Sequence, residues 1–117
     1  MKKDNIVQIK SYAFAVRIVK NYKHLCENKK EFILSKQLLR CGTSIGANIE
    51  EAIGGQSDKD FYAKLTISYK EARETHYWIR LLKDTNYLTE EESVSLLNDT
   101  DELLRIIGSI QKTLRNS

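Results

Sequence analysis

The 117-residue chain contains no proline, only five glycines and only two cysteines. Without proline and with so little glycine, collagen-like and low-complexity classes are excluded and a loop-rich fold is disfavoured. The cysteines, Cys26 and Cys41, form no CxxC pair and provide no disulfide framework, so we expect reduced thiols in a cytoplasmic protein. No apolar run approaches the ~18 residues of a membrane span, and the charged start leads into no signal-like segment, so we expect no membrane contact.

The chain has the length of a single domain, which we expect to span residues 1–117. Its formal net charge is +3, but the distribution is uneven, because residues 1–26 contain six lysine or arginine residues and a single aspartate. This first segment therefore carries +5 and the rest of the chain −2. Such an asymmetry points to an anionic partner for the first segment.

The spacing of apolar residues indicates four helices and no strand, because no stretch keeps the alternation of apolar and polar residues that a strand requires. The connections are only a few residues long, which makes consecutive helices antiparallel neighbours. The predicted fold is therefore all-α, an antiparallel up-down-up-down four-helix bundle. The predicted helices run from about Ile6 to Cys26, from near Phe32–Ser35 to just before Gly54-Gly55, from Ser57 to about Asp84, and from Thr89 to about Leu114.

Residues that favour helix ends flank these segments. Glycine pairs commonly stop a helix, and a Ser or Thr three residues before an acidic side chain commonly starts one. The acidic partner is best as Glu, so the third helix has a weaker capping box than the fourth. The expected N-caps are Asp4 or Asn5 for the first helix, Ser57 with Asp60 for the third, and Thr89 with Glu92 for the fourth.

The first predicted helix carries apolar side chains over more than half of its circumference. Packing against one core needs a stripe only somewhat wider than ~100°. In the third helix, Ile67, Trp78 and Leu82 also lie off the main apolar seam. Excess apolar surface is typical of subunit contacts, so we predict a homo-oligomer. The alternative is tight internal packing with a few exposed apolar groups, which is common in monomers.

A row of basic residues also follows the first helix. The row consists of Lys3, Lys10 and Arg17, spaced by seven residues, continued by His24 with Lys20 beside it. Because a seven-residue spacing drifts only ~20° per step around a helix, the row stays on one face. No acidic residue lies between Asn5 and Cys26 to neutralise it. We predict this row as a contact surface for the phosphates of RNA or DNA; the alternative is an ordinary solvated face.

The second predicted helix contains two glycines, Gly42 and Gly46, spaced by four residues. Each glycine costs a helix about 1 kcal/mol relative to alanine, so the pair predicts that another backbone approaches closely. GxxxG is a membrane dimer motif only in an apolar segment, which this one is not. Close packing within the bundle is therefore the predicted role.

A polar stripe runs down the same helix, and two glutamates of the third helix can face it. Carboxylates beside apolar neighbours need a cation or several hydrogen-bond donors. We predict a structural network in which Arg40 pairs with Glu71 or Glu74, within the chain or across a subunit boundary. The alternatives are a ligand-binding or catalytic cleft and a solvated face. The residues concerned are Arg40, Ser44, Asn48, Glu51, Glu71 and Glu74.

Motifs typical of enzymes are absent from the sequence. The only histidines, His24 and His76, do not follow a glutamate by three residues, so the di-iron pattern of ferritin-like bundles is missing. The sequence contains neither a phosphate-binding GxxxxGK[ST] loop nor a GxGxxG motif. We therefore expect no metal, no cofactor and no catalytic residue.

Two stretches are more specific than these patterns. They read RCGTSIGANIEEA at residues 40–52 and KEARETHYWI at residues 70–79, with Asp60-Phe61 between them and Asn86-Tyr87 after them. With these motifs the chain resembles, over essentially its whole length, the small four-helix-bundle proteins encoded in intervening sequences of bacterial 23S ribosomal RNA genes. It departs from the commoner pattern at Ala52-Ile53-Gly54, where many relatives have a glycine directly after the glutamate.

The resemblance implies a ring-like homopentamer without established enzymatic activity. A related accessory protein of diversity-generating retroelements resembles a basic pentameric barrel that binds nucleic acid and a reverse transcriptase. Two hypotheses follow for this chain. The first is a sequence-nonspecific nucleic-acid binder in which symmetry multiplies the basic row, and the second is a scaffold that binds a protein partner through apolar surface.

Overall fold

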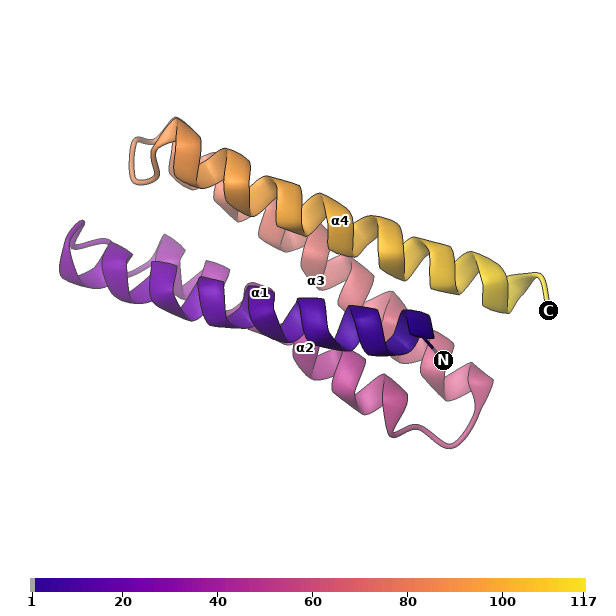
Figure 1. The fold of residues 1–117 in the computed structure, drawn as a ribbon. Coiled ribbons are helices and arrows are strands. Elements are labelled where there is room, and N and C mark those ends of the chain that lie inside the picture. Colours follow the sequence, from indigo (N-terminus) through magenta and orange to yellow (C-terminus); the bar gives the residue numbers. More distant parts are fainter. Residues whose placement is uncertain (1) are drawn as a thin grey trace.

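The structure is a computed structural model that describes residues 2–117, with side chains from Ile6 onward. It consists of α1 (Lys2–Glu27), α2 (Leu34–Ile53), α3 (Asp58–Asp84) and α4 (Glu90–Arg115), and the described chain contains no strand. Consecutive helices run in opposite directions, and the start of α1 lies at the same end as the end of α4 (Figure 1). The predicted all-α four-helix bundle is confirmed.

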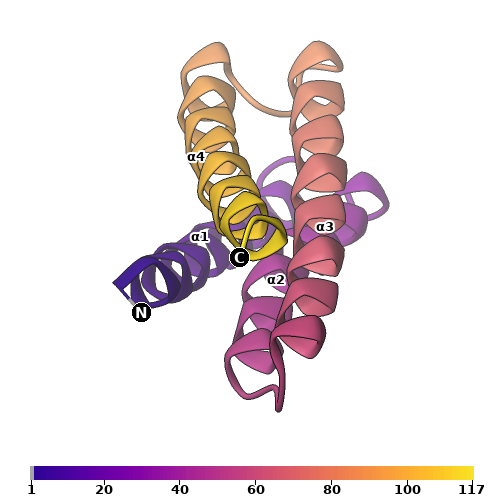
Figure 2. The ribbon, with the colours of Figure 1, turned by 90° about the vertical axis from the view of Figure 1, so that its right-hand side faces the viewer.

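The bundle is elongated, with extents of 47 × 21 × 19 Å. Contacts join α1 to α2, α2 to α3 and α3 to α4, whereas α1 meets α4 over a smaller area. Figure 2 shows the reason, because α3 and α4 run side by side while α1 crosses at a steeper angle. Within the described residues, α1 and α3 occupy diagonal positions and do not pack on one another.

Two of the predicted caps are present. The Ser57 hydroxyl accepts a hydrogen bond of 3.1 Å from the Asp60 backbone N–H at the start of α3. At the start of α4, the Thr89 hydroxyl accepts from the Glu92 N–H at 3.1 Å, and the Glu92 carboxylate accepts from the Thr89 N–H at 2.9 Å. This reciprocal pair is the predicted capping box, and it satisfies two backbone donors that a helix start leaves free.

The predicted cap of the first helix is wrong. Because α1 already begins at Lys2, Asp4 and Asn5 lie inside the helix and not at its N-cap. The segment contains no proline or glycine, so the helix extends through it, and each further residue adds one backbone hydrogen bond.

Glu31 caps the second helix, a role that the sequence analysis missed. Its carboxylate accepts hydrogen bonds from three backbone N–H groups: those of Ile33 at 3.2 Å, Leu34 at 3.1 Å and Ser35 at 2.7 Å. Burial favours the protonated carboxyl, but the backbone donors together outweigh burial and lower the pKa of Glu31 below its ordinary value. A buried glutamate thus starts α2 in place of a Ser, Thr, Asp or Asn.

The core contains side chains from all four helices, and its largest fully buried members are aliphatic apart from Phe14. Of the three residues predicted off the seam of α3, Leu82 belongs to this core, Trp78 packs against it, and Ile67 is exposed. The largest fully buried side chains are Phe14, Ile18, Leu25, Leu38, Ile45, Ile49, Leu65, Ile79, Leu82, Leu96, Leu103 and Ile107.

The two glycines of α2 pack closely against another helix of the bundle, as predicted, and that helix is α1. A Cβ atom placed on Gly42 would lie 2.8 Å from Cγ1 and 2.9 Å from Cγ2 of Ile18. At Gly46 the nearest atom would be the carbonyl oxygen of Ser11, at 3.2 Å. The Ile18 side chain at Gly42 and the α1 backbone at Gly46 therefore lie so close to α2 that no larger residue fits at either position without a shift.

We expect Gly42→Ala to lower the free energy of unfolding by about 1–3 kcal/mol, because the added methyl overpacks Ile18. The better helix propensity of alanine, worth ~1 kcal/mol, offsets part of this cost. Gly108→Ala is the matched control, since a Cβ there would lie 3.8 Å from Tyr69 Cε2, an ordinary contact. Urea denaturation followed by circular dichroism measures both variants.

The cost should depend on Ile18. In an Ile18→Ala background, which removes the clashing atoms, Gly42→Ala should cost much less. Equal costs in the two backgrounds, or a Gly42→Ala protein as stable as the Gly108→Ala control, would contradict the close packing of α1 on α2.

Candidate functional site

The basic row of α1 faces carboxylates of α4. Lys10 Nζ lies 3.2 Å from Glu102 Oε1, and Arg17 Nη1 lies 2.5 Å from Asp99 Oδ2. Arg17 Nη2 also donates to the Ser95 hydroxyl at 2.9 Å. Two central members of the predicted nucleic-acid surface are therefore ion-paired at the seam between α1 and α4.

The other members of the row differ in their surroundings. The Lys3 side chain lies outside the described side chains. Lys20 is exposed and has no ion pair within residues 6–117. His24 lies near Glu92, whose pKa is lowered mainly by the hydrogen bond from the Thr89 backbone and further by the charges of His24 and Lys29.

An acidic row on α4 thus matches the basic row on α1. The two rows run in opposite chain directions. From one end of the seam to the other, α1 presents Lys10, Arg17 and His24, and α4 presents Glu102, Asp99 and Glu92. Because the two helices are antiparallel neighbours, the two rows run beside each other, although the carboxylates are spaced by three and seven residues and the basic residues by seven. The sequence contained this signal, but it becomes visible only when two helices are compared in antiparallel register.

The predicted network between α2 and α3 forms within the chain. The Arg40 guanidinium contacts both predicted carboxylates, with Nη1 at 3.3 Å from Glu71 Oε2 and Nη2 on Glu74 Oε2. The indole N–H of Trp78 donates to the same Glu74 oxygen at 2.9 Å. Half of the Arg40 side chain is exposed, whereas only 20% of the Glu71 side chain is. The network is therefore only partly buried, with Glu71 its least exposed charged group.

The rest of the polar stripe does not join this network. The Asn48 amide donates to the Ser44 carbonyl at 2.8 Å within α2. Glu51 forms a separate ion pair with Lys64 of α3, at 2.7 Å. The stripe is thus divided between two ion-paired sites that join α2 to α3, an arrangement suited to fixing helix register.

Apolar side chains are exposed on two diagonal corners of the bundle. The outer α1 face consists of Ile9, Tyr12, Val16 and Val19, and both Ile9 and Tyr12 are 68% exposed. The outer α3 face consists of Ala63, Ile67, Tyr77 and Leu81, of which the first three are exposed and Leu81 is half-buried. The excess apolar width predicted for the first helix therefore lies at the surface of the single chain.

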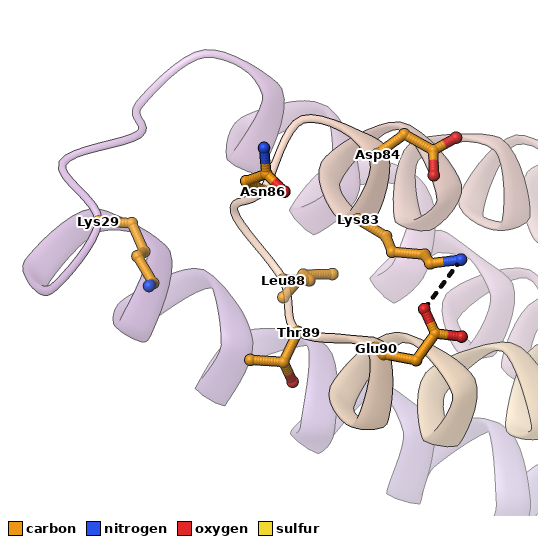
Figure 3. Close-up of a pocket in the computed structure, with 7 residues that line it drawn as sticks. All are labelled: Lys29, Lys83, Asp84, Asn86, Leu88, Thr89 and Glu90. Atoms are coloured by element: carbon orange, nitrogen blue, oxygen red, sulfur yellow. Dashed lines mark ion pairs between the residues drawn. The ribbon is translucent and has the colours of Figure 1, made fainter.

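A polar cavity of about 540 Å³ opens at the end of the bundle where two connections meet. Lys29 approaches from the α1–α2 connection, opposite Leu88 and Thr89 of the α3–α4 connection (Figure 3). Lys83 Nζ and Glu90 Oε2 pair across one side at 3.1 Å. Because its charged lining residues partly neutralise one another, this cavity has no concentrated charge for a ligand.

Residues that could perform redox or metal chemistry are few. Both cysteines are free thiols, and burial raises the pKa of Cys41 to about 11, so this thiol is protonated at neutral pH. Within the described residues, no cluster of three or more His, Cys, Asp or Glu side chains is arranged to hold a metal ion. Likewise, none of the helices in the described chain is both long and apolar enough to cross a membrane.

Comparison with known proteins adds two similarities. The sequence profile of the 23S rRNA-intervening sequence protein family matches residues 3–109. A crystal structure of a protein with unknown function from the S23 ribosomal protein family of Bacteroides thetaiotaomicron VPI-5482 is 55% identical in sequence, with a TM-score of 0.93. The match covers 94% of this chain and 98% of that one. A search of the curated proteins gives no match.

We expect Arg40→Met to lower the free energy of unfolding by about 1–2 kcal/mol. A fully buried pair would cost more, ~3–5 kcal/mol, but Arg40 is half exposed. The fluorescence of Trp78, the only tryptophan, should shift because Glu74 loses its cation. Lys36→Met, at an exposed position one turn earlier on α2, is the control; equal stability and emission in the two variants would show that the network contributes nothing.

The basic row yields a second prediction through a charge swap. Arg17→Glu should destabilise the protein by about 1 kcal/mol or more, because it places like charges opposite one another. Adding Asp99→Arg should restore most of the loss. Urea denaturation measures the variants, and Lys20→Glu, at a position without an ion pair in the described structure, is the control. Failure of the second substitution to restore stability would argue against pairing of the two rows.

Proposed function

The chain belongs to the 23S rRNA-intervening sequence protein family, and on this premise we propose that it acts as a non-enzymatic, homo-oligomeric helical-bundle protein. The observation that carries this proposal is the outer α1 face, where Ile9, Tyr12, Val16 and Val19 form an exposed apolar row. Full burial of a large apolar side chain contributes about 1.5–3 kcal/mol, so covering this row favours association.

The second copy would dock through a different surface. The outer α1 and outer α3 faces lie on diagonal corners of the bundle and carry different residues. When one face binds another face of the next copy, the contact is heterologous, and repetition either closes a ring or extends a filament. The resemblance of the sequence to its family implies a ring of five, and we propose that assembly.

Nucleic-acid binding through Lys3, Lys10, Arg17, Lys20 and His24 has less support. A cation that is already paired with a carboxylate must give up that pair before it can bind phosphate, and Lys10 and Arg17 are so paired. The same pairs support a role of the row in holding α1 against α4. A protein partner on the outer α1 face remains the competing occupant, as in the scaffold hypothesis.

Light scattering of the purified protein tests the assembly, with a multiple of 13.6 kDa expected. Val16→Glu and Ile67→Lys should each reduce the mass, because each places a charge within one apolar face. Both keep a favourable pair on their own helix, Val16→Glu with Lys20 and Ile67→Lys with Glu71, so the fold should persist. Asn98→Glu, at an exposed position on α4, is the control and should leave the mass unchanged.

Mixing the two variants distinguishes the interface types. Val16→Glu retains an intact outer α3 face and Ile67→Lys an intact outer α1 face, so a mixture should form a heterodimer that cannot extend. An isologous interface would not be rescued by mixing. A wild-type protein that scatters as a 13.6 kDa monomer at micromolar concentration would overturn the proposal and favour a different partner.

A further inference from the structure

A groove between α3 and α4 collects basic side chains from one side of α3. Arg73, His76 and Arg80 line it from α3, and Asp101 and Leu104 line it from α4. The cavity has a volume of about 310 Å³, near the lower limit of the range typical of ligand sites. We call these five residues the α3–α4 groove.

Contacts within the groove orient the central imidazole. Arg80 Nε donates to His76 Nδ1 at 3.0 Å, and His76 Nε2 lies 3.3 Å from Asp101 Oδ1. The imidazole is thus held between a cation and a carboxylate and can turn little. Within the described residues, only the Nε atom of Arg80 forms hydrogen bonds, to His76 Nδ1 and to the His76 carbonyl. The Cζ atom of Arg80 lies 6.0 Å from the Tyr77 ring centroid.

The groove has a net positive charge, since two arginines and a single carboxylate line it. Arg73 has no ion pair or hydrogen bond among the side chains from Ile6 onward, and neither terminal nitrogen of Arg80 has a carboxylate partner there. The groove therefore differs from the seams that hold Lys10, Arg17 and Arg40, where each cation lies on a carboxylate. Asp101 is the one carboxylate among the residues that line it.

We propose that the α3–α4 groove binds a phosphate group, a property that goes beyond the proposed assembly. Arg73 and Arg80 are seven residues apart, so they lie about two helical turns, or ~10.5 Å, apart on one side of α3. Two long side chains at this spacing can converge on one anion above His76. A guanidinium presents paired N–H donors that match the oxygens of a phosphate group.

The lining also predicts how binding responds to charge. Asp101 repels an anion while it holds His76 in place, so the groove should bind phosphate weakly in its present form. The apolar side chain of Leu104 leaves one wall without hydrogen-bond donors, where the organic group attached to a phosphate can lie. The same chemistry is offered by a free phosphorylated small molecule and by a phosphodiester of RNA.

Titration of the purified wild-type protein with inorganic phosphate at constant ionic strength, followed by amide chemical shifts in NMR spectra, tests the site. We expect saturable binding that Arg73→Gln and Arg80→Gln each weaken at least tenfold. Lys70→Gln removes the same charge from the exposed side of α3 and should change the affinity less than twofold. Light scattering and circular dichroism confirm that each variant keeps its mass and helix content.

A variant that improves binding separates the site from mere loss of structure. Asp101→Asn keeps an oxygen facing His76 but removes the negative charge, so it should tighten phosphate binding several-fold. Unsaturable binding, equal weakening by Lys70→Gln, or no gain with Asp101→Asn would overturn the proposal. Adenosine monophosphate and a single-stranded RNA oligomer then distinguish the two sources of phosphate. The natural type of ligand should bind more tightly than inorganic phosphate, and in Arg73→Gln its affinity should no longer exceed that of inorganic phosphate.

Discussion

The close approach of α1 to α2 determines how the remaining surfaces of the bundle are arranged. Ile18 fills the space above Gly42, and the Ser11 backbone passes over Gly46. This contact fixes the rotation of α1 about its own axis. Once that rotation is set, Phe14 must enter the core, the basic row must face α4, and the outer α1 face must point to solvent. Gly42 and Gly46 thus determine where the core-facing side chains, the basic row and the outer α1 face lie.

Charged side chains specify which helices are neighbours more than they stabilise the fold. Ion pairs lie at the α1–α4 seam, at the α2–α3 seam through Arg40 and Lys64, and at the α3–α4 seam through Lys83. Each exposed pair contributes only about 0–1 kcal/mol, so the aliphatic core provides most of the stability. They favour one register of the helices, because a shifted helix would separate each cation from its carboxylate. Cations that take no part in these ion pairs, such as Arg73, remain available for a ligand.

Local chemistry made most of the fold predictable. The end of α2 and the starts of α3 and α4 followed from Gly54, Ser57 and Thr89, because helix caps and stops depend on a few adjacent residues. The pairing of Arg40 with Glu71 and Glu74 also followed, since the polar stripe of α2 and the two glutamates of α3 each lie beside an apolar stripe. The helical period sets the direction in which each stripe faces. The cap by Glu31 was missed because a glutamate three residues before a helix becomes a cap only when the chain folds its carboxylate back onto three N–H groups.

The sequence by itself determined four helices, most of their ends, their antiparallel order and the apolar excess of the first helix, because these depend on periodicity and on residues close together in the chain. Only the tertiary structure decided the surroundings of each charge. Lys10 and Arg17 form an uninterrupted basic row along the sequence, yet the antiparallel neighbour α4 supplies their counter-charges from 92 and 82 residues away. Arg73 and Arg80 look like ordinary surface arginines in the sequence, yet the packing of α3 on α4 makes them the walls of a groove. Electrostatic surroundings depend on distances in space, which a helical period cannot supply.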